Sequence, residues 1–590
     1  MKRKDISKTM HKKMLYDYSG RAERQETIEF LLDFSSRHKR NTEEYWKKMR
    51  RYYDGDHDIR NTSVLFAKER SIPWVAAQST DGYVHVESQI NMTLPDFEFT
   101  PRDKTDYEKA KQREKIVKYI CENNRLEYFN SRNERRLGIL GSAVFKVCWD
   151  KEARFGEGKG DVSVFAPRPE EIFTDPSSAD VDGCEYIGYV YRMHKQKAMR
   201  VFAQDFRNSC TTLEDYLTND GFFGTYSKIN SEEYDVSDDT VTVTEWWFRQ
   251  PSDGKAKVRI GSEQINYEWK AGDIALSVLI NGKEIRYIPK YWKKTGFDSF
   301  PFVIYSRLPD EKSIWGKSEI DMMIPLIDAK DRELTYAQLN NAFSSNDIIL
   351  AEENALCDGE TLDNSPGAVW KVRPGMIGKV ARLGNMAQSQ SGLYTGAMYW
   401  QNLIETTTGN FEISQGKEPT SVTTATGIAL LNERAESRKS RKEIDRNEGF
   451  RRLYRLIDET ALEYYTDGRI VRLGFAEDNE FVYRFGGFVK KTRETYYIPS
   501  IDITIHTGRG IENSKAFTVS ALTSLIGMNI NSDNYKLVKA YVESIGIPER
   551  AEICDFLEEK FGDSKEGEIT GQEILKILED SLLEGEENNE

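Results

Sequence analysis

The chain has 590 residues, of which 38% are hydrophobic and 31% charged, and its net charge is −14. Such a chain can bury several cores, which excludes a disordered polymer, and no apolar stretch approaches the roughly 18 residues of a membrane span. The acidic balance also argues against a protein that binds nucleic acid tightly, because that affinity comes from Lys and Arg contacts to phosphate.

The distribution of charge and the spacing of the cysteines indicate in which compartment the chain is expected to fold. Residues 1–53 carry a surplus of Lys and Arg, whereas residues 566–590 are strongly acidic. The basic start has no apolar segment behind it, so we expect no secretory signal. The six cysteines lie far apart without a CxxC pair, which predicts free thiols in a reducing compartment rather than disulfides or a zinc site.

The first 140 residues are mostly helical in pattern. Apolar spacing predicts two helices within residues 20–53 and further helix over residues 105–140. Between them, residues 61–100 hold short apolar stretches that Pro73 and Pro95 interrupt.

The pattern then changes to the alternation of β-strands. The turn Asn281-Gly282 is a strong hairpin signal between two of these strands. Strands are predicted over residues 142–150, 162–176, 186–193, 240–248, 257–261 and 275–289.

The second half returns to helices, and the fold class predicted for the whole chain is therefore α+β. A helix over residues 316–346 contains Pro325, which we expect to kink it by removing one backbone hydrogen bond. The later segments are a compact turn-rich piece with short strands (347–384), a second helix (about 393–408), a polar loop, a long helix to about residue 465, strands (471–507) and a helical C-terminus.

No motif in the chain carries enzyme chemistry. The stretch DGDHD (54–58) resembles the start of a calcium loop, but Ile59 and Leu65 stand where Gly and Glu are required, so a solvated turn is expected. GEGKGD (156–161) and Gly316-Lys317-Ser318 lack the spacing of a phosphate-binding loop. We therefore expect no catalytic residues, no metal and no cofactor.

The order of several segments resembles that of the portal proteins of tailed bacteriophages. No single segment is diagnostic, but together they span roughly residues 45–465 in the family's order. They are WKKMRRYYDGDH (46–57), LGILGSAVFKVCWD (137–150), GDVSVFAPRPEEIFTDPSS (160–178), EWWF (245–248), FPFVIYSRLPDEKSIWGKSEIDMMIPLIDAKDRELTYAQLNNAF (300–343) and TTATGIALLNERAESRKSRKE (423–443).

The resemblance implies a ring, commonly of twelve subunits, at one capsid vertex, through which DNA is packaged and ejected. The implied partners are other copies of the chain, double-stranded DNA, the terminase motor, capsid or scaffolding protein, and head-to-tail adaptor or tail proteins, with assembly in the host cytoplasm and no membrane. The implied portal divisions are a wing (1–315 and 425–514), a stem of two helices (316–346 and 390–409), a clip (347–389), a tunnel loop (410–424) and a crown with an acidic tail (515–590).

Within this scheme the tunnel loop would line the channel. A twelve-fold ring would carry a charge of roughly −170, which suits a conduit that repels phosphate. Two other classes remain open: a different virion structural or adaptor protein, and a metal-dependent DNA-processing enzyme. The residues expected to face DNA are Gln415, Lys417, Glu418, Thr420, Ser421, Thr423 and Thr424.

Overall fold

The computed structural model describes most of the chain between Tyr16 and Tyr465 and isolated strands beyond it. The described residues are 16–57, 79–102, 106–151, 153, 160–208, 239–260, 263–345, 349–352, 355–357, 371–382, 390–409, 425–466, 469–472, 480–483, 490–491, 496–497, 501–506, 529–531 and 568–570.

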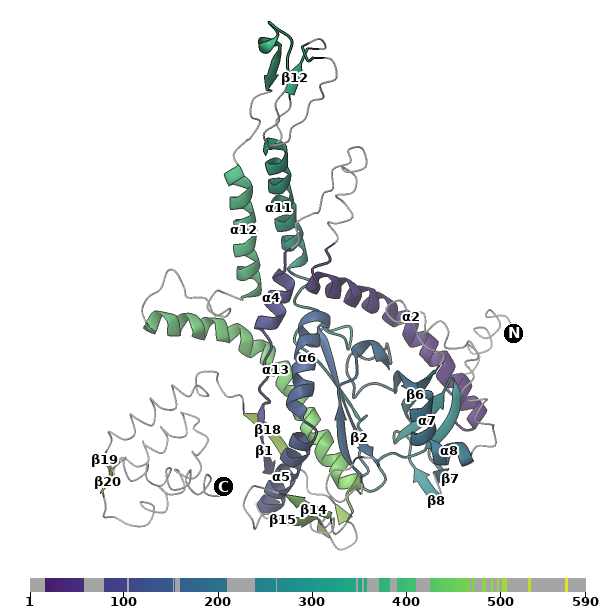
Figure 1. Ribbon diagram of the computed structural model, residues 1–590. Helices are drawn as coiled ribbons and strands as arrows, with labels where there is room; N and C mark the ends of the chain where they lie inside the picture. Colours follow the sequence, from purple (N-terminus) through teal and green to yellow (C-terminus); the bar gives the residue numbers. More distant parts are fainter. Residues whose placement is uncertain are drawn as a thin grey trace.

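The chain is an α+β protein, as predicted, with the elements in mixed order (Figure 1). The helices are α2 (Arg21–Tyr53), α4 (Asp81–Ser88), α5 (Tyr107–Asn123), α6 (Leu126–Leu140), α7 (Lys195–Val201), α8 (Ala203–Asn208), α11 (Ile324–Ser345), α12 (Gln390–Thr408) and α13 (Ala425–Tyr464). The strands are β1 (Asp96–Pro101), β2 (Ser142–Asp150), β3 (Asp161–Phe165), β4 (Ile172–Thr174), β5 (Tyr186–His194), β6 (Thr240–Arg249), β7 (Gly254–Ile260), β8 (Glu263–Trp269), β9 (Ile274–Ile280), β10 (Lys283–Ile288), β11 (Phe302–Ser306), β12 (Ile349–Ala351), β13 (Val380–Arg382), β14 (Arg469–Arg472), β15 (Glu480–Tyr483), β16 (Lys490–Lys491), β17 (Tyr496–Tyr497), β18 (Ile501–His506), β19 (Asn529–Asn531) and β20 (Glu568–Thr570).

Two antiparallel sheets form the centre of the body. One has five strands in the order β10-β9-β6-β5-β4, and the other has three in the order β11-β2-β3. Every residue of β9 is buried, so this strand lies inside the body with both faces covered. The predicted turn between β9 and β10 is confirmed, because Asn281 and Gly282 both have positive φ angles (47° and 82°), as a tight hairpin turn requires.

The N-terminal region differs from its prediction, because α2 is one continuous helix where two were expected. No Gly or Pro interrupts residues 21–53. The polar residues Ser35 and Lys39 in its middle are buried rather than exposed in a loop. The Lys39 ammonium donates to the backbone carbonyls of Pro169, Glu170 and Ile172 at 2.6–2.8 Å, so its tertiary contacts favour helix where the apolar pattern suggested a break.

The helices α11 and α12 lie side by side and project from the body, with the β12–β13 pair at their far end (Figure 1). The short strands of this tip and the helix α12 agree with the predicted pattern. The long helix α13 is also confirmed. Its second half packs on β11 and β2, while its first part extends away from the body (Figure 1).

The predicted helical C-terminus lies outside the described residues, apart from the antiparallel pair β19–β20.

Candidate channel elements and the buried ion-pair cluster beside them

The residues predicted to face DNA fall in the connection between α12 and α13. The first of these helices ends at Thr408 and the second begins at Ala425. The connection itself, with all seven predicted channel residues from Gln415 to Thr424, lies outside the described residues, so their role stays a prediction.

Pro325 lies in the first turn of α11, not inside a longer helix, so the kink expected within the helix is wrong. The residues before Pro325 form hydrogen bonds to the body of the protein. The Lys317 amide donates to the Leu308 carbonyl, and the Gly316 amide donates to the Ser142 hydroxyl. These bonds hold residues 316 and 317 against the body, ahead of the first residue of α11, Ile324. In a first turn the missing proline N–H costs nothing, because that group has no partner within the helix.

A buried histidine holds the start of α11 against the end of α2. The Nδ1 atom of His57 lies 2.5 Å from the Asp331 carboxylate, and neither side chain is exposed. The Ser79 amide also donates to Asp331, and the Tyr52 ring stacks on the imidazole. The turn predicted at DGDHD is therefore present, but His57 is part of the core rather than solvated.

Further polar contacts join α11 to α4 and to α12. Lys330 on α11 pairs with Asp81 at 2.7 Å and also donates to Gln401 on α12. The Trp400 indole donates to Glu333 across the two projecting helices at 3.1 Å. Polar contacts thus fix the orientation of the α11–α12 pair relative to the body, at the end of the pair that is nearest to the body.

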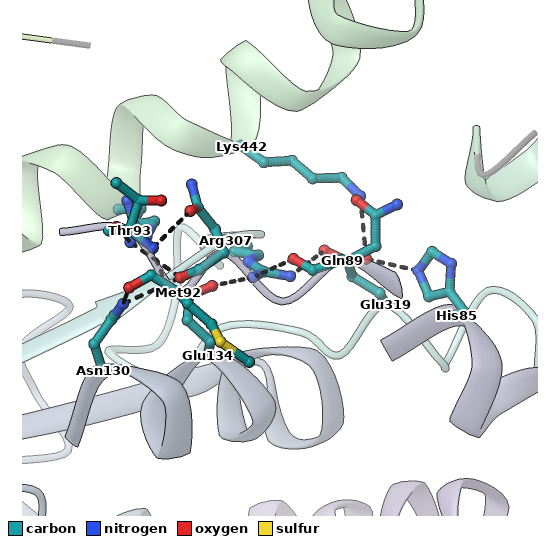
Figure 2. A network of polar contacts seen from close by, with 11 residues as sticks. His85, Gln89, Met92, Thr93, Asn130, Glu134, Arg307, Glu319 and Lys442 are labelled. Atoms are coloured by element: carbon teal, nitrogen blue, oxygen red, sulfur yellow. Dashed lines mark hydrogen bonds and ion pairs between the residues drawn. The ribbon is translucent and has the colours of Figure 1, made fainter. Parts of the chain in front are cut away.

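A cluster of buried charges includes Glu319, in the segment just before α11 (Figure 2). Its two carboxylates are Glu134 on α6 and Glu319, which precedes α11, and both are buried. The Arg307 guanidinium lies between them and forms ion pairs with both. His85 on α4 reaches Glu319 through Nε2 at 2.7 Å. We name this set of residues, with Lys442 and Arg446, the Glu134–Glu319 cluster.

The helix α13 supplies the remaining two cations. Arg446 donates to Glu134 at 2.6 Å and to the Thr93 carbonyl at 2.8 Å, and Lys442 pairs with Glu319 at 3.1 Å. The cluster therefore joins α4, α6, the segment before α11 and the long helix at one point.

The charges around Glu319 determine its protonation state. Burial alone would raise the pKa of its carboxyl group. The hydrogen bond from His85 and the charges of Lys442 and Arg307 outweigh burial and hold the pKa well below its ordinary value. Glu319 is therefore ionised near neutral pH, and the cluster contains real ion pairs.

Sequence reasoning missed every member of this cluster. Its residues are single positions far apart in the sequence, and the directly paired Glu134 and Arg446 are separated by 312 residues. No spacing rule relates such positions. The one local sign is that Lys442 and Arg446 are four residues apart and so lie on one face of the predicted helix.

Neither a metal-binding group nor a membrane-spanning helix is found among the described residues. Among them, no group of three or more His, Cys, Asp or Glu side chains is arranged to hold a metal ion. A search of the same residues for helices of sufficient length and apolarity to cross a bilayer found none.

The described residues thus form an α+β body with a projecting helical pair, and a long helix follows that pair in the chain. The family model described as Phage P22-like portal protein matches residues 82–575. This match covers well over half of the chain, and the chain therefore belongs to the P22-like portal protein family. No curated protein matches it.

Family membership confirms the resemblance inferred from the segment order. The chain is thus a tailed-phage portal protein, a structural head–tail connector of the virion with a role in genome packaging.

Proposed function

We propose that this chain forms the ring-shaped channel at one capsid vertex through which genomic DNA is packaged and later ejected. The packaging motor, and then the tail, would attach to the end formed by the β12–β13 pair. The observation that carries the proposal is the projecting α11–α12 pair with its small tip, in a chain that belongs to a portal family. The pair would be the stem, the tip the clip, and the connection 410–424 the tunnel loop.

The exposed side of the projecting pair supports assembly into a ring. Tyr394, Met398 and Tyr399 on α12 are exposed, the last two by 68% and 61%, and Tyr336 on α11 is exposed as well. Tyr394 and Met398 are one helical turn apart and form a continuous apolar strip. Soluble monomers rarely leave such patches uncovered, and a neighbouring copy of the same pair is the partner that a ring supplies.

The charge of the chain supports passage of DNA rather than its retention. At −14 per subunit, walls that carry a share of this charge repel phosphate over the roughly 8–10 Å of a screening length. A strongly basic wall would instead bind DNA by releasing counterions and would oppose sliding.

Electron microscopy of the purified full-length chain, combined with a native mass measurement, tests the proposal. Rings of one size, expected to be dodecamers, with an open central channel and the α11–α12 pairs around it, would support it. A stable monomer under all conditions, or a closed assembly without a channel, would favour another virion component. Metal-dependent DNA cleavage or ATP turnover by the pure chain would favour the DNA-processing enzyme.

A further inference from the structure

Two nitrogen atoms from different helices contact a single oxygen atom of Glu319. His85 Nε2 lies 2.7 Å from Oε2, and Lys442 Nζ lies 3.1 Å from the same atom (Figure 2). Arg307 contacts the other oxygen, Oε1, at 3.5 Å. Glu319 therefore has two partners, His85 and Arg307, that do not depend on α13.

The two cations of α13 are held very differently. The Arg446 side chain is 5% exposed, has two close acceptors, and lies with its guanidinium 4.8 Å from the Phe450 ring centre. Lys442 is 23% exposed and, within the described part of the chain, has Glu319 as its single ion-pair partner.

The charge balance of the cluster makes the Lys442 contact dispensable. With Lys442 in place, three permanent cations face two carboxylates; without it, Arg307 and Arg446 still neutralise Glu134 and Glu319. The Nδ1 atom of His85 is buried and has no hydrogen-bond partner among the described residues. Departure of Lys442 thus leaves Arg307 and Arg446 on the two carboxylates, whereas departure of Arg446 leaves the fully buried Glu134 with Arg307 alone.

From this asymmetry we propose that Lys442–Glu319 is a releasable latch and that Arg446–Glu134 is a fixed pivot. With the latch closed, α13 is joined at Lys442 to Glu319, in the segment just before α11. With the latch open, residues 425–441 change their angle to the α11–α12 pair while the body stays folded. This device rests on the cluster alone and holds whether or not residues 410–424 line a channel.

Hydrogen exchange of the full-length chain, resolved to short peptides, tests the latch. In the Lys442→Met variant the amides of Ile320, Met323 and Ile324, which are hydrogen-bonded within the turn before α11, should exchange about two- to fivefold faster, the range that a partly exposed ion pair can supply. The amides of α13 around Lys442 should exchange faster as well, while the denaturation midpoint of the whole chain stays unchanged. Lys442→Arg should restore the wild-type rates.

Arg452→Met is the matched control, because Arg452 is another partly exposed cation of α13 whose partners are Glu448, at 3.3 Å, and Asp182, at 3.9 Å, and not Glu319. It should leave the three reporter amides unchanged. Unchanged exchange at those amides in Lys442→Met would overturn the proposal. A fall in the denaturation midpoint as large as that of Arg446→Met would also overturn it, because Lys442 would then be as essential as the pivot.

Discussion

Arg446 and Glu134 form an ion pair at 2.6 Å although 312 residues separate them, and the Glu134 side chain is fully buried. This contact joins the long helix α13 to α6 at the centre of the molecule. Several expectations depend on it and on related contacts.

Replacing Arg446 with Met should lower the free energy of unfolding by about 3–5 kcal/mol, because the buried Glu134 carboxylate loses one of its two cations. Urea denaturation of the purified chain measures this. Arg451→Met serves as the control: its side chain is 53% exposed and pairs with Glu448, so the expected loss is below about 1 kcal/mol. Similar small losses in both variants would show that the buried pair contributes little.

Replacing His57 with Leu should destabilise the junction between α2 and α11 by about 3 kcal/mol, because Asp331 keeps only the Ser79 amide as a described partner. Thermal unfolding provides the measurement. His38→Leu, at an exposed position of α2, should change the midpoint little. Equal effects of the two substitutions would argue against a structural role for the His57–Asp331 pair.

Lys39 should make stability depend on pH in the alkaline range. Burial lowers the pKa of its amine to about 8, below the 10.5 of the ordinary side chain. Between these values the unfolded chain binds more protons than the folded one, so this contribution rises with pH and is lost as pH falls through 8. The stability difference between wild type and Lys39→Met should therefore grow by about 2 kcal/mol from pH 7 to pH 9.5. If the stability difference between wild type and Lys39→Met does not change with pH, the three carbonyl acceptors keep the amine charged over the whole range.

Charges placed on the exposed strip of α12 should prevent ring formation without unfolding the subunit. Met398→Glu combined with Tyr399→Glu places two carboxylates where a neighbouring copy is expected to pack, and burying unpaired charge is costly. Sedimentation should show subunits instead of rings, with an unchanged circular dichroism spectrum. Thr406→Glu, at another exposed position of α12, is the control and should still assemble. Normal rings from the double variant would place the subunit interface elsewhere.

The proposed tunnel loop can be tested by Lys417→Glu and by deletion of residues 416–419. Lys417 and Glu418 nearly cancel in charge, and Gly416 and Pro419 interrupt regular structure, as expected of a loop that adapts to passing DNA. Both variants should assemble rings but package or retain little DNA in a complementation assay. Normal packaging by both, or a density map that places the loop on the outer rim, would reject the role.

Local chemistry was enough to predict much of the fold. The β9 strand, the Asn281-Gly282 turn and the extent of α13 follow from the local side-chain pattern and from backbone preferences within a few residues. The order of several segments also resembles that of portal proteins, and the family match over residues 82–575 confirms this resemblance.

Contacts between distant segments decided the rest. The α2 helix continues through its polar middle because Lys39 donates to carbonyls 130 to 133 residues away. The amides of residues 316–318 bond to the body, and α11 starts only at Ile324. The Glu134–Glu319 cluster has no local pattern at all. Its charges can be buried only where the fold brings opposite charges together, and the energy of that pairing depends on tertiary distance rather than on separation along the chain.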